Sequence, residues 1–250
     1  MKLTMLGTGN ALVTECYNTC FVLSDGNDHF MVDGGGGMTV LHQLKYAGLD
    51  WRQMRTIFVT HKHIDHLLGI IWMMRMICQH MREGTYEGEA TIYAHDEVIA
   101  LLRDLAGKLL QKKELPFLDS RLHLIAVADG EEKTILGRKT TFFDIGSTKA
   151  CCGDEPYNEC EKQYAEHSTW LLHEAFCLHG QADIFHPYEK HHSTVKDAAE
   201  LAESLGVKNL LLYHTEDQNI ARRKELYTAE GRQYFHGNLF VPEDLEVIEL

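Results

Sequence analysis

The sequence predicts an α/β protein in which two packed β-sheets are covered by helices on their outer faces. Three observations support this prediction. Short apolar runs typical of strands occur in both halves of the chain, helical patterns lie between them, and no repeat, low-complexity tract or linker divides the sequence. With 250 residues, of which 44% are apolar, the chain can bury a substantial core, so we expect a single domain spanning residues 1–250.

The first half of the chain predicts an alternation of strands and helices. Glycines and other turn-forming residues separate the apolar runs, and apolar residues at helical spacing mark the segments between them. The predicted strands cover residues 2–6, 20–23, 30–32, 56–59 and 91–94. The predicted helices cover residues 38–48, 67–80 and 95–110.

The second half predicts further strands and one clear helix. The strands cover residues 122–127, 133–136, 139–145, 169–172, 209–213 and 245–250, the last as an edge strand. Gly137-Arg138 is predicted to join two of them in a hairpin. The helix covers residues 195–205, with Ser193 or Thr194 as its N-cap.

Charge and composition limit the expected function and location. The net charge of −13 argues against a broad nucleic-acid-binding surface, although a local basic patch with divalent ions would still permit an RNA substrate. The seven cysteines lack paired CxxC spacing and predict reduced thiols. The N-terminal apolar run is too short for a signal peptide, and residues 67–78 are too few to span a membrane. We therefore expect a cytoplasmic protein without a membrane segment.

A cluster of three histidines and an aspartate, residues 60–66 (THKHIDH), directly follows a predicted strand. Side chains two apart in an extended segment point the same way, so His61 and His63 can bind one metal ion from one side. Asp65 and His66 then reach a second ion or the opposite side of the first. Imidazole and carboxylate ligands suit Zn²⁺, Fe²⁺ or Mn²⁺. The alternative, a solvated histidine-rich loop, is disfavoured by this constrained spacing.

Four consecutive glycines follow Asp33 at the end of another predicted strand. Glycine permits backbone angles closed to other residues and allows close approach to a neighbour, so we expect this loop to lie against the metal cluster. A plain flexible turn is the alternative.

The order of these motifs resembles the metallo-β-lactamase superfamily, and in particular its ribonuclease Z-like members. The resemblance covers most of the chain. It is carried by HKHIDH followed by LLG at residues 61–69, LGTGN at 6–10, VDGG at 32–35, GD at 153–154, HEAF at 173–176, HHST at 191–194 and LLYHT at 211–215. It implies a four-layer αββα sandwich, that is, an α/β fold of two mixed β-sheets flanked by helices, with metal ions at one edge between the sheets.

The same resemblance implies the residues of a two-metal site, with Zn²⁺ expected and Mn²⁺ or Fe²⁺ as alternatives. The implied ligands are His61, His63, Asp65, His66, Asp154 and His214, with Asp154 bridging. Asp65 would also orient the attacking hydroxide, His192 would protonate the leaving group, and Glu174 would orient His192. From residue propensities alone, Asp154 could equally be a turn or helix-cap aspartate before Pro156, and His192 could be an exposed loop residue.

One ligand histidine of the implied set is missing. The resemblance places it at Gly146, before Ser147-Thr148. His123 is the nearest substitute, but it lies within an apolar strand pattern. We therefore expect the ion bound by Asp65, His66, Asp154 and His214 to keep its full set of protein ligands. The other ion, bound by His61, His63 and Asp154, would be weaker, completed by water, or absent.

The leading functional hypothesis is a metal-dependent hydrolase in which an activated hydroxide cleaves a phosphodiester. Ribonuclease Z-like enzymes that process the 3′ end of precursor tRNA carry a protruding arm, for which the chain has no room between Gly146 and Asp154. With the acidic charge, this favours a small phosphodiester over an RNA endonuclease. A lactone, thioester or β-lactam hydrolase of the same fold and a non-enzymatic metal-binding protein with a degenerate site are the alternatives. By resemblance we also expect a homodimer.

Overall fold

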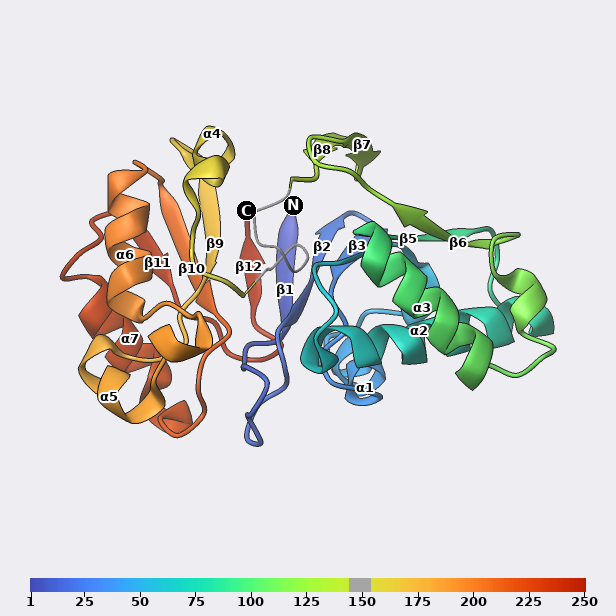
Figure 1. Ribbon diagram of the computed structural model, residues 1–250, viewed down its shortest axis with the longest axis horizontal. Coiled ribbons are helices and arrows are strands. Elements are labelled where there is room, and N and C mark those ends of the chain that lie inside the picture. Colours follow the sequence, from blue (N-terminus) through green and yellow to red (C-terminus); the bar gives the residue numbers. More distant parts are fainter. Residues whose placement is uncertain (144–153) are drawn as a thin grey trace.

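The computed structural model describes residues 1–143 and 154–250. Several features of the sequence analysis lie outside the described residues: Gly146 with Ser147 and Thr148, the adjacent Cys151 and Cys152, Gly153, and the end of the strand predicted over residues 139–145. The described strands form one large sheet, one small sheet and a two-stranded hairpin (Figure 1). Among the described helices, none combines the length and apolarity that crossing a bilayer requires.

The large sheet has seven strands in the order β12-β1-β2-β3-β4-β5-β6. Pairing is antiparallel from β12 to β3 and parallel from β3 to β6, so the sheet is mixed as predicted. Its strands are β1 (Lys2–Gly7), β2 (Cys20–Asp25), β3 (Asp28–Val32), β4 (Met54–Val59), β5 (Ala90–Ala94), β6 (Leu122–Ala126) and β12 (Val247–Glu249).

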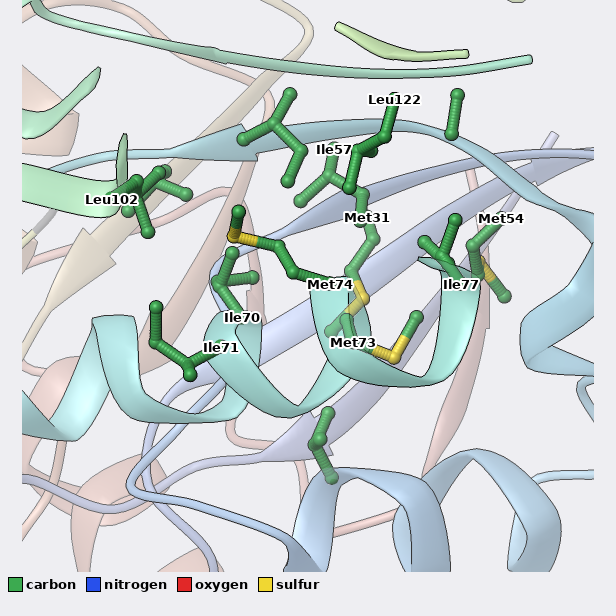
Figure 2. Close-up of a cluster of buried hydrophobic side chains, with 14 of the residues drawn as sticks. Met31, Met54, Ile57, Ile70, Ile71, Met73, Met74, Ile77, Leu102 and Leu122 are labelled. Atoms are coloured by element: carbon green, nitrogen blue, oxygen red, sulfur yellow. The ribbon is translucent and has the colours of Figure 1, made fainter. Parts of the chain in front are cut away.

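Three helices cover the outer face of the large sheet: α1 (Thr39–Tyr46), α2 (Ile64–Glu83) and α3 (Asp96–Leu109). The apolar side of α2 packs on the sheet, where Met74 and Ile77 lie against Met31 and Ile57 (Figure 2). The methionines of α2 thus fill the core, as flexible side chains can. α2 ends at Glu83, and the left-handed backbone of the C-cap residue Gly84 (φ 74°) stops the helix.

The small sheet has the order β11-β10-β9 and consists of β9 (Trp170–Glu174), β10 (Asn209–Tyr213) and β11 (Asn238–Phe240). Two helices, α6 (Val195–Ser204) and α7 (Arg223–Gly231), pack on its outer face. The prediction of a second mixed sheet is wrong for the described strands, because both pairs of this sheet are parallel. Each helix returns the chain to the starting end of the sheet, which makes consecutive strands parallel.

Apolar side chains between the two sheets form the centre of the molecule. Leu3 and Met5 of β1 and Ile248 of β12 cluster with Leu211 and Tyr213 of β10. The order of layers is therefore helices, large sheet, small sheet, helices, which is the predicted αββα arrangement.

The remaining described elements are short. β7 (Glu132–Ile135) and β8 (Arg138–Thr141) pair as the predicted hairpin, but its turn is Leu136-Gly137, both with positive φ, instead of Gly137-Arg138. α4 (Lys162–Ala165) and α5 (Ala182–Phe185) are single turns. Thr194, one of the two predicted caps of α6, accepts a hydrogen bond from the Asp197 N–H and forms a capping box.

Candidate metal centre

Candidate site residues lie where three strands of two sheets end. His61 follows β4 of the large sheet by two positions, His214 directly follows β10 of the small sheet, and Glu174 is the last residue of β9. The sheets are joined at this edge, since the Thr215 N–H donates to the Thr8 carbonyl at 3.0 Å and the Asn10 N–H donates to the Thr215 carbonyl at 3.0 Å. Segments more than 200 residues apart in sequence are thereby held together at the site.

Helix α2 supplies Asp65 and His66 from its first turn. The sequence predicted a helix beginning at residue 67, but the observed helix begins at Ile64, with His63 as its N-cap residue. The two side chains are therefore fixed by helical geometry. Asp65 is also the acidic residue of the first turn, where the helix dipole favours negative charge.

The structure brings the predicted ligands into two overlapping groups: Asp65, His66, Asp154 and His214 in one, and His61, His63 and Asp154 in the other. Asp154 faces both groups with different oxygens. Its Oδ1 lies 3.4 Å from His61 Nε2, whereas its Oδ2 lies 3.6 Å from His66 Nε2 and 3.2 Å from His214 Nε2. This is the geometry a bridging carboxylate needs.

The unpaired polar atoms of these groups fit divalent metal ions. Nε2 of His61, His66 and His214 and Oδ2 of Asp65 are buried and have no hydrogen-bond partner. Asp65 Oδ2 lies 3.3 Å from His66 Nε2 and 3.7 Å from His214 Nε2. Ligands about 2.1 Å from a tetrahedral zinc ion lie about 3.4 Å from one another, so the spacing of this group matches such an ion. Buried polar atoms left without a partner would otherwise destabilise the fold.

Asp33 sets the orientation of two histidines from outside the predicted ligand set. Its Oδ2 accepts from His66 Nδ1 at 2.9 Å and from the Thr60 hydroxyl at 2.8 Å. Because the Thr60 hydroxyl gives its proton to Asp33, it accepts from His61 Nδ1, 3.0 Å away. Nδ1 of each ring is therefore engaged as a donor, and Nε2 is the atom that each ring turns toward the site. The motif at residues 32–35 gave no sign of this role for Asp33.

The glycine loop lies against the metal centre, as expected. The Gly34 N–H donates to the His66 carbonyl at 2.9 Å, and the Gly69 N–H donates to the Gly35 carbonyl at 2.9 Å. The loop and α2 approach so closely that a Cβ on Gly69 would lie 1.8 Å from the Gly34 carbonyl oxygen. Glycines on both sides are thus required by backbone contact and do not form a plain flexible turn.

Three of the eight described non-glycine residues with positive φ lie at this site: Asp33 (φ 58°), His191 (φ 60°) and His214 (φ 57°). Such conformations are unfavourable for residues with a Cβ and are retained where the surrounding structure determines them. At all three positions the conformation places a side chain or its neighbour at the metal centre.

Charges within the group favour metal binding. Burial alone would raise the pKa of Asp65 and of Asp154, but the neighbouring histidines lower both well below the ordinary range, so the carboxylates are ionised. Burial, together with the charge of His66, lowers the pKa of His61 to about 4. Burial would also lower the pKa of His66, yet the carboxylates of Asp33, Asp154 and Asp65 raise it. These carboxylates give the site an excess of negative charge, which favours a proton on His66 and which a bound divalent cation would neutralise instead.

His192 and Glu174, predicted as proton donor and orienting carboxylate, lie beside the first group. His192 Nδ1 donates to the Asp154 carbonyl at 2.8 Å and lies 3.3 Å from Glu174 Oε2. The other carboxylate oxygen of Glu174 accepts from the Ser193 N–H. Burial would lower the pKa of His192, but Glu174 raises it above its ordinary value. With Nδ1 engaged, Nε2 is the atom of His192 that is free to donate to a substrate.

Gly146, the position where the resemblance places a fourth ligand of the second group, lies outside the described residues. His123, the substitute considered from the sequence, lies on β6 and contacts Glu89 at 3.0 Å. It belongs to none of the metal-binding groups in the described part of the chain.

A cavity of about 440 Å³ adjoins the metal-binding groups and is lined by His61, His63, Asp154, His192 and His214. Asn10, Ala11 and Leu12 of the loop between β1 and β2 form a further wall. This loop is tied to the second half of the chain, since Asp217 accepts from the Glu15 N–H at 3.0 Å. The volume suits a small ligand.

Comparison with known proteins identifies the family. Residues 1–235 match the family described as anti-Pycsar protein Apyc1. The chain belongs to this family. Among curated relatives, ribonuclease Z of Methanothermobacter thermautotrophicus is 25% identical over 304 residues, covering 100% of this chain and 97% of that protein. Ribonuclease Z of Bacillus licheniformis is 27% identical over 273 residues, covering 86% of this chain and 88% of that protein.

Solved structures share the fold of this Apyc1 family member. The metallo-β-lactamase fold protein YhfI from Bacillus subtilis aligns with a TM-score of 0.79 at 19% identity, covering 100% of this chain and 99% of that one. A diphosphatase of the PhnP family aligns with a TM-score of 0.73 at 16% identity, covering 100% of this chain and 97% of that one. The short form of human tRNase Z aligns with a TM-score of 0.68 at 18% identity, covering 100% and 99%.

These comparisons confirm the predicted superfamily, its ribonuclease Z-like branch, the αββα fold and a metal-dependent hydrolase. The groups of histidines and aspartates indicate that the protein binds a metal ion, but they do not identify which metal it is.

Proposed function

We propose that this protein is a hydrolase that uses two divalent ions, of which Zn²⁺ is the expected one, to cleave a small phosphodiester. The observation that carries the proposal is the pair of groups that meet at Asp154, with one carboxylate oxygen facing each. Nitrogen and oxygen donors at this spacing suit zinc, and also Mn²⁺ or Fe²⁺. The relatives named ribonuclease Z support phosphodiester chemistry.

We assign the predicted roles to these residues. Asp65, His66, Asp154 and His214 would hold one ion, and His61, His63 and Asp154 would hold the other. When bound, the ions would lower the pKa of water toward about 7 and offset negative charge on the phosphate. Asp65 would accept a hydrogen bond from the attacking water and so orient it, and His192 would donate a proton from Nε2 to the leaving oxygen.

The choice of a small diester over precursor tRNA rests on charge and on chain length. The net charge is −13, and too few residues separate Gly146 from Asp154 for a tRNA-binding arm. The relatives named ribonuclease Z favour a phosphodiester over a lactone, thioester or β-lactam, and in that reaction His192, paired with Glu174, would protonate the leaving alkoxide.

The test is a pair of assays on protein loaded with Zn²⁺ or Mn²⁺, one with bis(4-nitrophenyl) phosphate and one with precursor tRNA. We expect metal-dependent release of nitrophenol and no release of the 3′ trailer. Trailer cleavage would overturn the preference for a small substrate. Absence of bound metal together with absence of hydrolysis would support the non-enzymatic alternative.

A variant tests the role of His192. His192→Asn should lower kcat by about 10²–10⁴-fold, the usual contribution of general acid catalysis, without changing metal content. The loss should be larger for a methyl ester than for a nitrophenyl ester, because a poor leaving group depends more on protonation. His186→Asn is the matched control, since His186 is exposed and, like His192, lies beside a carboxylate, here that of Glu189 at 3.5 Å. An equal loss for both esters would contradict the assignment.

We further propose that residues 1–250 form one domain, that the protein is cytoplasmic, and that it is a homodimer. Pairing of β1 with β12 and the mixed origin of the site residues support a single domain. The dimer and the cytoplasmic location follow from the family resemblance and the cysteine pattern. Light scattering coupled to gel filtration would measure the oligomeric state, and a monomeric mass would overturn the dimer.

A further inference from the structure

The phenyl ring of Phe176 lies flat against the imidazole of His192. The two ring centroids are 4.7 Å apart, and the ring planes differ by 9°. The ring of His214 also lies near His192, at 5.0 Å between centroids, but it is tilted by 45°. Phe176 is 4% exposed and is part of the lining of the cavity at the metal centre. Its nearly parallel contact therefore supports one face of the His192 ring.

The polar contacts of His192 meet at a single ring atom. Nδ1 donates to the Asp154 carbonyl at 2.8 Å and lies 3.3 Å from Glu174 Oε2. Hydrogen bonds to a carbonyl oxygen tolerate a broad range of directions. These contacts therefore hold Nδ1 in place but constrain the tilt of the ring less tightly. The position of Nε2, the atom proposed to donate the proton, depends on that tilt.

The backbone of Phe176 is fixed relative to the segments on both sides of it. Its N–H donates to the Ser193 carbonyl at 2.9 Å, next to His192 in the chain. Its carbonyl accepts from the Glu216 N–H at 2.8 Å, in the segment that follows β10, and from the Tyr227 hydroxyl of α7 at 3.3 Å. The phenyl ring is thus presented to His192 from a rigid position.

The contact of Phe176 with His192 has a consequence for proton transfer. A general acid acts only within about 2.6–3.2 Å of the oxygen that it protonates, so a change of tilt that moves Nε2 lowers the rate. We propose that Phe176 is a positioning residue for the proton donor, and that its ring fixes the tilt of the His192 imidazole and thereby directs Nε2 toward the leaving oxygen. This inference rests on the proposed function.

Three variants of buried phenylalanines test the inference. Phe176→Leu keeps an apolar side chain but removes the flat face, whereas Phe176→Tyr keeps the flat face. Phe185→Leu is the matched control, because Phe185 belongs to the same buried cluster as Phe176 but lies on α5. The kcat and KM of each metal-loaded variant are measured with methyl 4-nitrophenyl phosphate and with methyl phenyl phosphate.

We expect Phe176→Leu to lower kcat about 2- to 10-fold with little change in KM, the fold-change that corresponds to the contribution of an aromatic pair. The loss should be larger for methyl phenyl phosphate, because phenolate is the poorer leaving group and depends more on protonation. Phe176→Tyr should keep most of the kcat, and Phe185→Leu should behave like the unaltered protein. An equal loss of kcat in Phe176→Leu and Phe185→Leu, or a change in KM alone, would overturn the proposal.

A double variant separates positioning from direct contact with the substrate. If Phe176 acts through the imidazole, Phe176→Leu should not lower kcat further in a protein that already carries His192→Asn. A further loss as large as the one in the unaltered background would mean that Phe176 acts without His192, and the proposal would be wrong.

Failure of the proposed function is recognised separately. If the unaltered, metal-loaded protein hydrolyses neither diester, the proposed function fails, and the mobility of the His192 ring is then measured by carbon relaxation in NMR. The ring signal is assigned by its loss in His192→Asn. The order parameter of the ring should fall in Phe176→Leu and stay unchanged in Phe176→Tyr and Phe185→Leu. Equal order parameters in the unaltered protein and in Phe176→Leu would overturn the proposal.

Discussion

At the level of single residues, Asp33 receives only donors. It accepts from the Thr60 N–H at 2.8 Å, from the Thr60 hydroxyl and from His66 Nδ1. A carboxylate suits this role because, when ionised, it only accepts hydrogen bonds and can therefore pair with all three donors. Through these bonds, Asp33 keeps a proton on Nδ1 of His66 directly and on Nδ1 of His61 by way of Thr60, although Asp33 is not itself a candidate ligand.

Asp33→Asn should therefore weaken metal binding by about 10–100-fold, the usual effect of losing such a supporting hydrogen bond. The amide would replace one acceptor oxygen by a donor that faces other donors. Metal content after dialysis, measured by mass spectrometry, and kcat/KM for an aryl diester are the readouts. Asp25→Asn, at the exposed end of β2, is the control and should keep the metal. Normal metal content in Asp33→Asn would contradict the role.

Burial of His29 should make the free energy of unfolding depend on pH, and His29 lies on β3 outside the candidate metal-binding groups. It is buried on β3 beside Ser24, 2.8 Å from the hydroxyl, and burial lowers the pKa of His29 below its unfolded value of 6.5. As the pH drops below about 6.5, His29 becomes protonated in the unfolded chain but not yet in the folded protein. The free energy of unfolding therefore decreases as the pH decreases, until the pH passes the lower pKa of the folded state. His29→Gln should reduce the difference in urea midpoint between about pH 7.5 and about pH 5.5. An unchanged difference would contradict this account.

The sequence could predict which residues meet at the site, but it could not predict the separate contacts that each of them makes there. Residues 61–66 carry a constrained spacing, and the ligand roles proposed for His61, His63, Asp65 and His66 rest on it together with the family resemblance. The separate orientation of the two Asp154 oxygens depends on segments that meet only in the folded chain. The same holds for Asp33, whose partners lie about 30 residues away.

At the level of elements, the start of α2 determines where Asp65 and His66 lie, because both belong to its first turn. The helix begins three residues before its apolar pattern, where the His66 and Leu67 N–H groups donate to the His63 carbonyl, and the Gly34 N–H donates to the His66 carbonyl beside it. Periodicity of apolar residues could not reveal this extension, since Asp65 and His66 are polar and yet buried. Strands with clear apolar runs, such as β10, were predicted at their observed bounds.

The contact between α2 and the glycine loop predicts opposite effects for two glycine substitutions. Gly69→Ala should destabilise the protein by about 1–3 kcal/mol, the cost of overpacking, and should weaken metal binding by shifting Asp65 and His66. Gly107→Ala is the matched control. Gly107 lies within α3, and a Cβ there would meet no atom within 4 Å, so alanine should stabilise by about 1 kcal/mol through helix propensity. Denaturant unfolding measures both, and equal effects would contradict the contact.

Among the elements that were not predicted from the sequence are α7 and β11. α7 buries only Arg223, Tyr227 and Gly231, so it lacks an apolar stripe, and β11 has three residues. Both depend on the small sheet for their formation. Local pattern is a weak signal where packing on a neighbouring layer determines the element.

At the level of the whole molecule, the metal centre connects the two sheets. His61, His63, Asp65 and His66 come from the first half of the chain, and Asp154 and His214 come from the second. Without a cation, buried carboxylates and unpaired ring nitrogens face one another across this junction. Bound ions should therefore stabilise the association of the two sheets as well as support catalysis.

Metal removal should lower the thermal midpoint, and added Zn²⁺ or Mn²⁺ should restore it. At a free metal concentration 100 times Kd, the gain for one site is about 2.7 kcal/mol. Scanning fluorimetry of chelator-treated protein with and without added metal measures the shift. Asp154→Asn, which weakens the carboxylate common to both groups, should show a much smaller shift. Equal shifts in both proteins would mean that the ions bind elsewhere.

The pairing of the first strand with the last has a consequence for synthesis of the chain. β1 lies between β2 and β12, and the Leu250 N–H binds the Met1 carbonyl at 2.9 Å, so the two ends of the described chain lie side by side (Figure 1). Residues of β1 are made long before those of β12, so the large sheet is complete only after β12 has left the ribosome. Ribosome-tethered chains halted before residue 247 should remain open to proteases, and a permuted gene that joins β12 directly to β1 and begins elsewhere should still encode a folded protein.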